Sequence, residues 1–396
     1  MVKDMLISGV ICEFNPLHNG HKYLLDAIKK ETGGYTVCVM SGNFVQRGEC
    51  AIIDKYRRTK MALANGADLV IELPSPFAVA TAEKFAFGGV SLLDALGCCD
   101  RIYFGSESGT ATELSFIAKL LKSEEFSSAL SDEIRTGDNF ATARENAVKK
   151  LAGSEVANML RKPNNILGIE YIKALETLKS SIKPYTVKRI GADHDSEDKG
   201  VNASAKAIRE CMLSGSAYSH MMPEDNIYYI NDAVKHGEAP ASLAYCERSI
   251  LADLRRAKPE DLLNIPDVSE GIENKIISAA RVSGTLVGLY AKIKSKRYSH
   301  ARIRRIILSY YLRIDKSFNR IPYIKVLGMN RNGLDIIKSK TNTLPYVVNF
   351  SDVKKLDDYS QELFAHEAMI DDIYALMQPV VADGGKYYTT PPIIQL

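Results

Sequence analysis

The chain has 396 residues, of which 46% are hydrophobic and 25% charged, and its net charge is +3. This composition is typical of a soluble globular protein with two or three domains, and it excludes a disordered chain or a small disulfide-stabilised peptide. Charge-free stretches are shorter than the roughly 20 apolar residues of a membrane-spanning helix, so we expect no membrane as a partner.

The cysteines indicate a reducing compartment. Their number is odd, no CxxC pair is present, and most of them stand in apolar segments, as buried free thiols do. The spacing of His and Cys residues matches no zinc site, and we predict no metal ligands. These observations favour a cytoplasmic protein. The seven residues are Cys12, Cys38, Cys50, Cys98, Cys99, Cys211 and Cys246.

The first 110 residues alternate apolar β-rich runs with helical patterns, which is typical of βαβ units and a parallel sheet. We predict strands over 6–13, 35–40, 67–73 and 101–104, and helices over 20–30, 54–65 and 79–96. Ligands of such sheets bind at the carboxyl ends of the strands. The loops after these strands are therefore the first place to look for a site.

The pattern is helical from residue 109 to about 180, and it then predicts a strand over 184–190 and a helix from Ser204. Beyond residue 214 it is mainly helical, with a basic helix over 299–312 and short strands over 323–328 and 345–349. We predict an α/β fold with two domains. Residues 1–213 form a parallel-sheet, Rossmann-like domain, and residues 214–396 form a mainly α-helical one.

Positive charge is concentrated in one window. Residues 292–340 contain fourteen Lys or Arg residues and two acidic ones, a net charge of +12, whereas the rest of the chain sums to −9. We expect this window to give the molecule one face for a polyanion.

The turn after the first strand, residues 14–25, reads FNPLHNGHKYLL. Pro16 ends the strand, Gly20 allows close approach of a ligand, and the helix that begins here points free N–H groups forward. His18 and His21 are three residues apart and can donate hydrogen bonds to phosphate oxygens. The simpler alternative is two turn histidines without a ligand, but the whole combination favours nucleotide binding.

This turn resembles the HxGH motif of the nucleotidyltransferase and class I aminoacyl-tRNA synthetase superfamily, which implies a HUP/Rossmann-like nucleotidyltransferase domain that binds ATP. The superfamily's second motif is matched in part by NASAKAIR at residues 202–209, where Ser204 and Arg209 align. Ala205 and Lys206 stand in place of hydroxyl residues, and Lys206 is predicted to bring positive charge to the triphosphate. Ser204 has a plain alternative as a helix N-cap.

Five further segments resemble the bacterial tRNA(Met) cytidine acetate ligases over most of the chain. They are MSGNFVQRGE (40–49), KYRRTKMALANGADLVIELP (55–74), FGSESG (104–109), KPNNILGIEYIKAL (162–175) and IPYIKVLGMNRNG (321–333). The resemblance implies an enzyme that makes acetyl-adenylate from ATP and acetate and forms N4-acetylcytidine at the wobble position of elongator tRNA(Met). It implies RNA, and not DNA, as the nucleic-acid partner.

The resemblance also implies the site residues. Those expected to bind ATP are Ile11, Cys12, Glu13, Phe14, Asn15, Pro16, Leu17, His18, Asn19, Gly20, His21, Lys22, Tyr23, Leu24, Gly105, Asn164 or Asn165, Arg189 and Ser204. His18, His21, Lys206 and Arg209 are expected to act on the phosphates in catalysis. Mg²⁺ is expected to bridge the phosphates, although no acidic metal motif is evident. Cys50 and Asp54 depart from the family pattern.

Two alternatives remain open. A small-molecule adenylyltransferase of the same superfamily would explain the HxGH turn but not the basic window, and a non-catalytic RNA-binding protein would explain the window but not the phosphate motifs. In the ligase interpretation the window docks tRNA. Its tyrosines then either stack on bases or belong to the core. They are Tyr298, Tyr310, Tyr311 and Tyr323.

Overall fold

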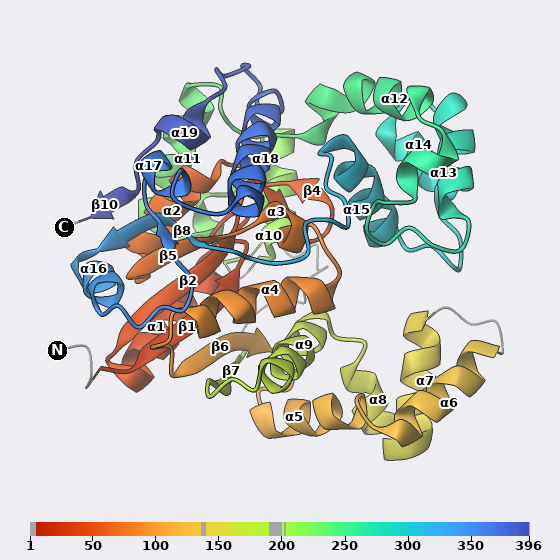
Figure 1. The fold of residues 1–396 in the computed structure, drawn as a ribbon, viewed down its shortest axis with the longest axis horizontal. Helices are drawn as coiled ribbons and strands as arrows, with labels where there is room; N and C mark the ends of the chain where they lie inside the picture. Colours follow the sequence, from red (N-terminus) through yellow and green to blue (C-terminus); the bar gives the residue numbers. More distant parts are fainter. Residues whose placement is uncertain (1–4, 136–139, 190–199, 202, 396) are drawn as a thin grey trace.

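A computed structural model describes residues 5–135, 140–189, 200–201 and 203–395. Its centre is an eight-stranded sheet in the order β10-β8-β5-β2-β1-β6-β7, with β9 paired to β8 (Figure 1). The pairing of β5 with β8 is antiparallel and the other pairs in this sheet are parallel. The predicted α/β class is confirmed. The strands of this sheet are β1 Ile7–Cys12, β2 Tyr35–Ser41, β5 Leu69–Leu73, β6 Arg101–Ser106, β7 Lys183–Lys188, β8 Ile324–Asn330, β9 Tyr346–Val347 and β10 Ile393–Gln395.

The predicted strands correspond to these elements with ends that differ by a few residues. Ile190, the last residue of the strand predicted over 184–190, and Asn202, the first of the second motif, lie outside the described residues. Two features were not predicted: strand β10, and an antiparallel hairpin of β3 Phe44–Val45 and β4 Glu49–Cys50. Both are too short for a periodic pattern to reveal them.

Helices cover both faces of the sheet, because its strands are apolar on both sides. On one face Ile11 and Val39 pack against α4 and α9, and on the other Val10 and Cys38 pack against α1, α2 and α10. Successive strand residues therefore point into two different cores. The helices are α1 Asn19–Thr32, α2 Lys55–Ala64, α3 Ser75–Ala78, α4 Ala82–Ala95, α9 Pro163–Leu178, α10 Ala205–Ser214 and α11 Glu224–Lys235.

Two groups of helices project from the sheet on the same side in Figure 1, one yellow and one teal. The first consists of α5 Ala111–Leu120, α6 Glu124–Arg135, α7 Phe140–Ala152 and α8 Ser154–Met159. The second, here called the helical lobe, consists of α12 Glu247–Arg256, α13 Ile272–Arg281, α14 Leu286–Ile293 and α15 His300–Tyr311. The lobe has its own apolar core, which includes Leu289, Ile303 and Ile306.

The sheet draws strands from both sides of residue 214, because β8, β9 and β10 join the strands of the first half. The remaining helices, α16 Arg331–Lys338, α17 Phe350–Val353, α18 Asp358–Ala375 and α19 Lys386–Thr389, also follow residue 214. The division into domains 1–213 and 214–396 stays a prediction. Across the described ranges, no helix combines the length and the apolar character needed to cross a bilayer. All seven cysteines are free thiols, and six of them are buried.

Candidate active site

A cavity of ≈ 310 Å³ lies at the carboxyl ends of β1, β6 and β7. The chain continues from β1 to β2 on one side and from β6 to β7 on the other, so the cavity lies where the strand order reverses and where open α/β sheets bind ligands. Predicted site residues that line it are Ile11, Cys12, Glu13, Phe14, Asn15, His18, Gly20, His21, Tyr23, Leu24, Gly105, Asn164, Arg189, Ser204 and Arg209. Predicted residues outside its lining are Pro16, Leu17, Asn19, Lys22, Asn165 and Lys206.

The turn between β1 and α1 is held by buried polar contacts. The guanidinium of Arg58, which is fully buried, donates to the carbonyl oxygens of Glu13 at 2.7 Å and Ser41 at 3.1 Å. Asn15 Oδ1 accepts from the N–H of Ile52 at 2.8 Å. Phe14 adopts a left-handed φ of 45°, which redirects the chain into α1. The shape of this turn is therefore set by contacts with the segment around α2.

His18 and His21 form a reciprocal cap at the beginning of α1. His18 Nδ1 accepts from the N–H of Gly20 at 3.0 Å, and His21 Nδ1 accepts from the N–H of His18 at 3.4 Å. Because Nδ1 accepts in both rings, each neutral imidazole carries its proton on Nε2. The ring centroids are 3.8 Å apart. Both rings line the cavity, so their N–H groups and the positive end of α1 suit an anionic ligand.

Gly20 is required by this cap. A Cβ at position 20 would lie 2.9 Å from His18 Cε1 and 3.1 Å from His18 Nδ1. A larger residue would push the imidazole away from the N–H that it accepts from. The glycine of the HxGH turn therefore positions a histidine, in addition to permitting a close approach of backbone to ligand.

Cationic side chains line the same cavity. Arg209 from α10 donates to the carbonyl oxygen of Asn15 at 2.9 Å and lies 3.4 Å from Glu49 Oε2. Arg47, Lys188 and Arg189 complete this cationic rim. Such a set of donors matches phosphate oxygens.

The second motif divides into inner and outer residues. Ser204 Oγ caps α10 by accepting from the N–H of Ala207 at 3.2 Å, so the alternative as an N-cap applies, and the residue also lines the cavity. Lys206 lies outside the lining, with a side chain that is 42% exposed and 3.9 Å from Glu210. Lys206 thus lies outside the cavity, although it is only one helical turn before Arg209, which lines it.

The two asparagines of the PNN turn have different positions. Asn164 lines the cavity, and its Nδ2 donates to Glu107 Oε1 at 2.7 Å. Asn165 is buried beneath it, where its Oδ1 accepts from the N–H groups of Glu107 at 3.0 Å and Ser108 at 3.2 Å. Asn165 thus holds the loop after β6 in place, and Asn164 is the residue within reach of a ligand.

The opposite wall of the cavity is apolar. The ring centroids of Phe104 and Tyr171 are 5.5 Å apart, and Phe85, Ile166 and Leu167 continue the wall. Glu13 lies between wall and rim, and burial raises the pKa of its carboxyl group, whose Oε1 accepts from the N–H of Gln46 at 2.8 Å. An apolar wall beside a cationic rim suits a ligand with a flat ring and an anionic tail.

Sequence reasoning missed several lining residues. The hairpin residues among them belong to the segment MSGNFVQRGE, whose resemblance to the family was the only signal for a role. In the apolar wall, Phe104 and Tyr171 likewise belong to segments that resemble the family, FGSESG and KPNNILGIEYIKAL, whereas Phe85 read as an ordinary core position. The missed residues are Val10, Val45, Gln46, Arg47, Glu49, Ala82, Phe85, Phe104, Pro163, Ile166, Leu167, Tyr171, Val187, Lys188 and Ala205.

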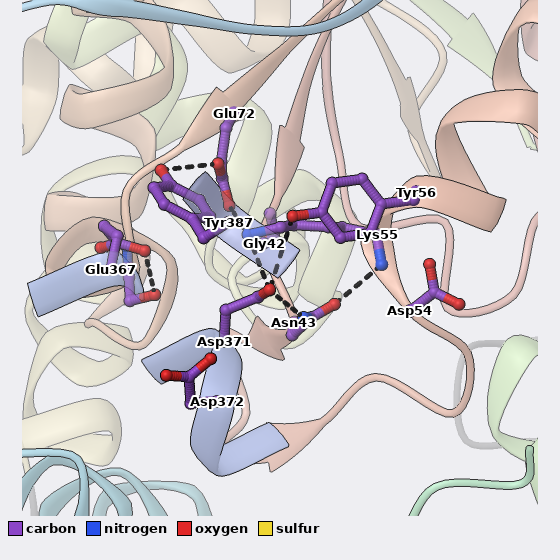
Figure 2. A network of polar contacts seen from close by, with 12 residues as sticks. Gly42, Asn43, Asp54, Lys55, Tyr56, Glu72, Glu367, Asp371, Asp372 and Tyr387 are labelled. Carbon is purple, nitrogen blue, oxygen red and sulfur yellow. Dashed lines mark hydrogen bonds and ion pairs between the residues drawn. The ribbon is translucent and has the colours of Figure 1, made fainter. Parts of the chain in front are cut away.

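A second polar cluster, here called the buried network, lies near the end of β5 (Figure 2). Lys55 Nζ is 2.9 Å from Glu72 Oε1 and 3.0 Å from Asp371 Oδ1, and all three side chains are almost fully buried. Tyr387 donates to Glu72 Oε2 at 3.0 Å, and Glu367 accepts from the Ser75 N–H at 2.6 Å. In the part of the chain that is described, no group of three or more His, Cys, Asp or Glu side chains could hold a metal ion.

The basic window does not form one face. Lys325 is buried in β8, and α16, which ends at Lys338, lies across the molecule from α15 (Figure 1). In α15, Arg302 pairs with Glu270 at 2.9 Å and Arg305 with Asp267 at 2.8 Å. The charged side chains that remain exposed at the junction of α14 and α15, here called the basic loop, are those of Lys292, Lys294, Lys296 and Arg297.

The tyrosines of the window belong mostly to the core. Tyr298, Tyr310 and Tyr323 are buried, and Tyr298 donates to the carbonyl oxygen of Glu270 at 2.6 Å. Of the two alternatives for these tyrosines, the core applies to Tyr298 and Tyr310, which pack in the lobe, and to Tyr323, which packs in a separate apolar cluster with Phe364. Tyr311 is half-buried.

The chain is similar to known proteins along almost its whole length. The model of the HIGH Nucleotidyl Transferase family matches residues 5–386. A tRNA(Met) cytidine acetate ligase from Caldanaerobacter subterraneus is 44% identical over 93% of this chain and 94% of its own. One from Acetivibrio thermocellus is 37% identical over 98% and 100%. The crystal structure of Thermotoga maritima TmcAL bound with alpha-thio ATP superposes with a TM-score of 0.91 at 32% identity, covering 98% of this chain and 99% of that one.

Proposed function

The chain belongs to the HIGH nucleotidyl transferase family and, within it, to the tRNA(Met) cytidine acetate ligases, and from this we propose that it is an ATP-dependent ligase that joins acetate to the wobble cytidine of elongator tRNA(Met). The product is N4-acetylcytidine. The observation that carries the proposal is the cavity at the strand-order reversal, where two capped imidazoles and a cationic rim face an apolar wall.

The first half-reaction activates acetate. A carboxylate oxygen of acetate attacks the α-phosphorus of ATP, the new P–O bond forms, and the bond to the β-phosphate breaks so that pyrophosphate leaves with the electron pair. His18 and His21 donate through Nε2–H to phosphate oxygens, and Arg209 neutralises charge beside them. Asn164 is the asparagine that contacts the nucleotide, while the apolar wall with Phe104 and Tyr171 receives the adenine. Lys206, on the outer side of α10, acts at most through the solvent-facing end of the triphosphate.

The second half-reaction transfers the acetyl group. The exocyclic N4 of cytidine attacks the acetyl carbonyl, the C–N bond forms, the bond to the AMP oxygen breaks, and N4 gives up a proton. A wobble base in an anticodon loop is already unstacked, so it can enter a pocket that a duplex base cannot reach. Close positioning supplies most of the acceleration, because the N4 lone pair is delocalised into the ring.

Magnesium is expected with the triphosphate, but the described residues around the cavity form no carboxylate cage for it. The acidic side chains of the cavity lining are Glu13 and Glu49, and both are engaged by neighbouring donors. Magnesium would therefore be carried by the phosphates, and no step depends on a protein ligand for it.

The basic loop is the proposed docking surface for the tRNA backbone, with Arg304 one helical turn beyond His300 on α15. Its charges are exposed and can meet several phosphates. The enzyme works where tRNA is modified, which in bacteria is the cytoplasm.

Pyrophosphate exchange into ATP tests the proposal. We expect exchange that depends on acetate and precedes any need for RNA, followed by N4-acetylcytidine at the wobble position when tRNA(Met) is added, measured by mass analysis of the nucleosides. Exchange that depends on a nucleotide precursor would instead indicate a small-molecule adenylyltransferase. Absence of exchange together with tRNA binding would indicate a non-catalytic RNA-binding protein.

A further inference from the structure

The β3–β4 hairpin lies between the cavity and the helical lobe. Gln46 and Glu49 line the cavity, whereas Phe44 and Cys50 are buried in the apolar core that they share with Ile303 of α15. One side of a seven-residue segment thus faces the candidate nucleotide site, and the other side is part of the lobe that carries the basic loop.

The turn of this hairpin touches the backbone of α15. Gly48 has a φ of 73°, and a Cβ at this position would lie 2.6 Å from the carbonyl carbon of Arg304 and 2.6 Å from the nitrogen of Arg305. No side chain fits between the turn and the helix. The turn therefore packs directly against the middle of α15, one residue before Glu49.

That residue, Glu49, is shared by two arginines. Its Oε1 pairs with Nη1 of Arg304 from the lobe, and its Oε2 lies 3.4 Å from Nη2 of Arg209 in the cavity. The side chain of Glu49 is 28% exposed, and those of Arg209 and Arg304 are 18% and 35% exposed. One half-buried carboxylate thus neutralises one cation of the phosphate rim and one cation beside the basic loop.

We propose that Glu49 is a positioning residue through which a triphosphate in the cavity and RNA on the lobe weaken each other's binding. The inference rests on the proposed function, in which phosphates pair with Arg209 and the RNA backbone with Arg304. When one of the two ligands binds, its phosphates pair with one arginine, and Glu49 keeps its ion pair with the other arginine. When the second ligand binds as well, its phosphates pair with the remaining arginine. Glu49 is then half-buried between two anionic ligands without a cation, which is unfavourable.

This competition gives the two half-reactions an order. While the triphosphate occupies Arg209, Glu49 retains Arg304 and holds it away from the RNA. When pyrophosphate leaves, the adenylate has a single phosphate, Arg209 returns to Glu49, and Arg304 becomes available. RNA therefore binds tightest after the acetyl group has been activated, so ATP is consumed before the acceptor is fully engaged.

Calorimetric titration of a non-hydrolysable ATP analogue, with and without the anticodon stem-loop of tRNA(Met), tests the inference. In the wild-type protein we expect saturating RNA to raise the Kd of the analogue on the order of tenfold, and the analogue to raise the Kd of the RNA by the same factor. AMP, which lacks the β- and γ-phosphates, should show a much smaller effect. In Glu49→Gln the factor by which each ligand raises the Kd of the other should fall to about one, because the amide carries no charge to be left unpaired.

The matched control is Asp267→Asn. Asp267 forms an ion pair with Arg305 of the same helix and does not line the cavity, so this variant should keep the wild-type factor. Independent binding of the two ligands to the wild-type protein would overturn the inference, even if Glu49→Gln were to fail to fold. A Glu49→Gln variant that folds and keeps the wild-type change in Kd would also overturn the inference. If the wild-type protein bound no ATP analogue and catalysed no acetate-dependent exchange, the proposed function itself would fall and this inference with it.

Discussion

The carboxyl edge of the sheet carries two polar regions that differ in how their charges are satisfied. At one end, the buried network places Lys55 between two acidic side chains, and the C-terminal helices α18 and α19 cover it (Figure 2). At the other end, beyond β1, the cationic rim and the capped imidazoles face a cavity of ≈ 310 Å³. One region neutralises itself within the chain. The other lines an open cavity with cationic and imidazole donors, where an anionic ligand can reach them.

This difference separates structural charge from functional charge. A buried ion pair with complete hydrogen bonding fixes which segments meet, and removing one partner leaves an unpaired charge. A rim of cations at a cavity attracts an anionic ligand and is stabilised further when that ligand binds. Both regions use residues from the segments that resemble the ligase family, so the resemblance alone does not tell the two uses apart. Burial and partners do.

The largest expected effect is a loss of stability when the buried network is broken. Lys55→Met leaves Glu72 and Asp371 buried without their cation, and we expect the free energy of unfolding to fall by about 3–5 kcal/mol in urea denaturation. Lys60→Met, on the exposed side of the same helix, should change it by less than about 0.5 kcal/mol. Equal effects of the two variants would mean that the network contributes nothing specific.

The next effect is on catalysis. His21→Ala removes an Nε2–H donor from the cavity, and we expect acetate-dependent pyrophosphate exchange to fall by about 100- to 1,000-fold, with tRNA affinity nearly intact in a filter-binding assay. His236→Ala, at an exposed histidine of the α11 end, should leave exchange unchanged. Loss of tRNA affinity in His21→Ala would break the proposed division between cavity and lobe.

The network also predicts a pH dependence of stability. Burial and the nearby Glu72 raise the pKa of Glu367 to about 8. The folded state then holds a proton that the unfolded state releases near pH 4.5, so the contribution of Glu367 to stability falls as the pH rises from about 5 to 8, by at most about 1.4 kcal/mol per pH unit.

Glu367→Gln keeps the neutral form at every pH, so it should flatten the stability profile measured by denaturation between about pH 5 and 8. Glu362→Gln, at an exposed position of the same helix, should leave the wild-type profile in place. A Glu367→Gln profile parallel to that of the wild type would mean that Glu367 is ionised in the folded protein over this range.

The smallest expected effect is a loss of tRNA affinity when the basic loop is changed. Replacing Lys294, Lys296 and Arg297 by Ala should weaken tRNA binding about tenfold and make the slope of log K against log salt less steep by about 2 to 3, without loss of exchange activity. Replacing Lys338, the last residue of α16, and Lys340, just after it, removes charge from the same window but from another side of the molecule, and should leave the salt slope as it is. An equal loss of tRNA affinity in both variants would mean that the whole basic window, residues 292–340, contacts the tRNA.

Local chemistry was readable from the sequence. The parallel strands, the helix that begins after Asn19 and the anion site at the HxGH turn follow from periodicity, from the preferences of Pro and Gly, and from free N–H groups at a helix end. The family resemblance added the activity and the substrate. In the second motif, the alignment of Arg209 with a phosphate-binding position agrees with its place in the cavity lining.

Contacts between residues that are remote in the sequence could not be predicted from the sequence alone. Only the tertiary structure places Asn164 at the cavity and Asn165 beneath it, directs Lys206 outward, buries Tyr298 and Tyr323 in the core, and joins Glu49 to arginines 160 and 255 positions away. A residue type sets which interactions a side chain can make, and its neighbours along the chain set its local backbone. Which charges meet, and which remain open to a ligand, depends on the packing of segments that are remote in sequence.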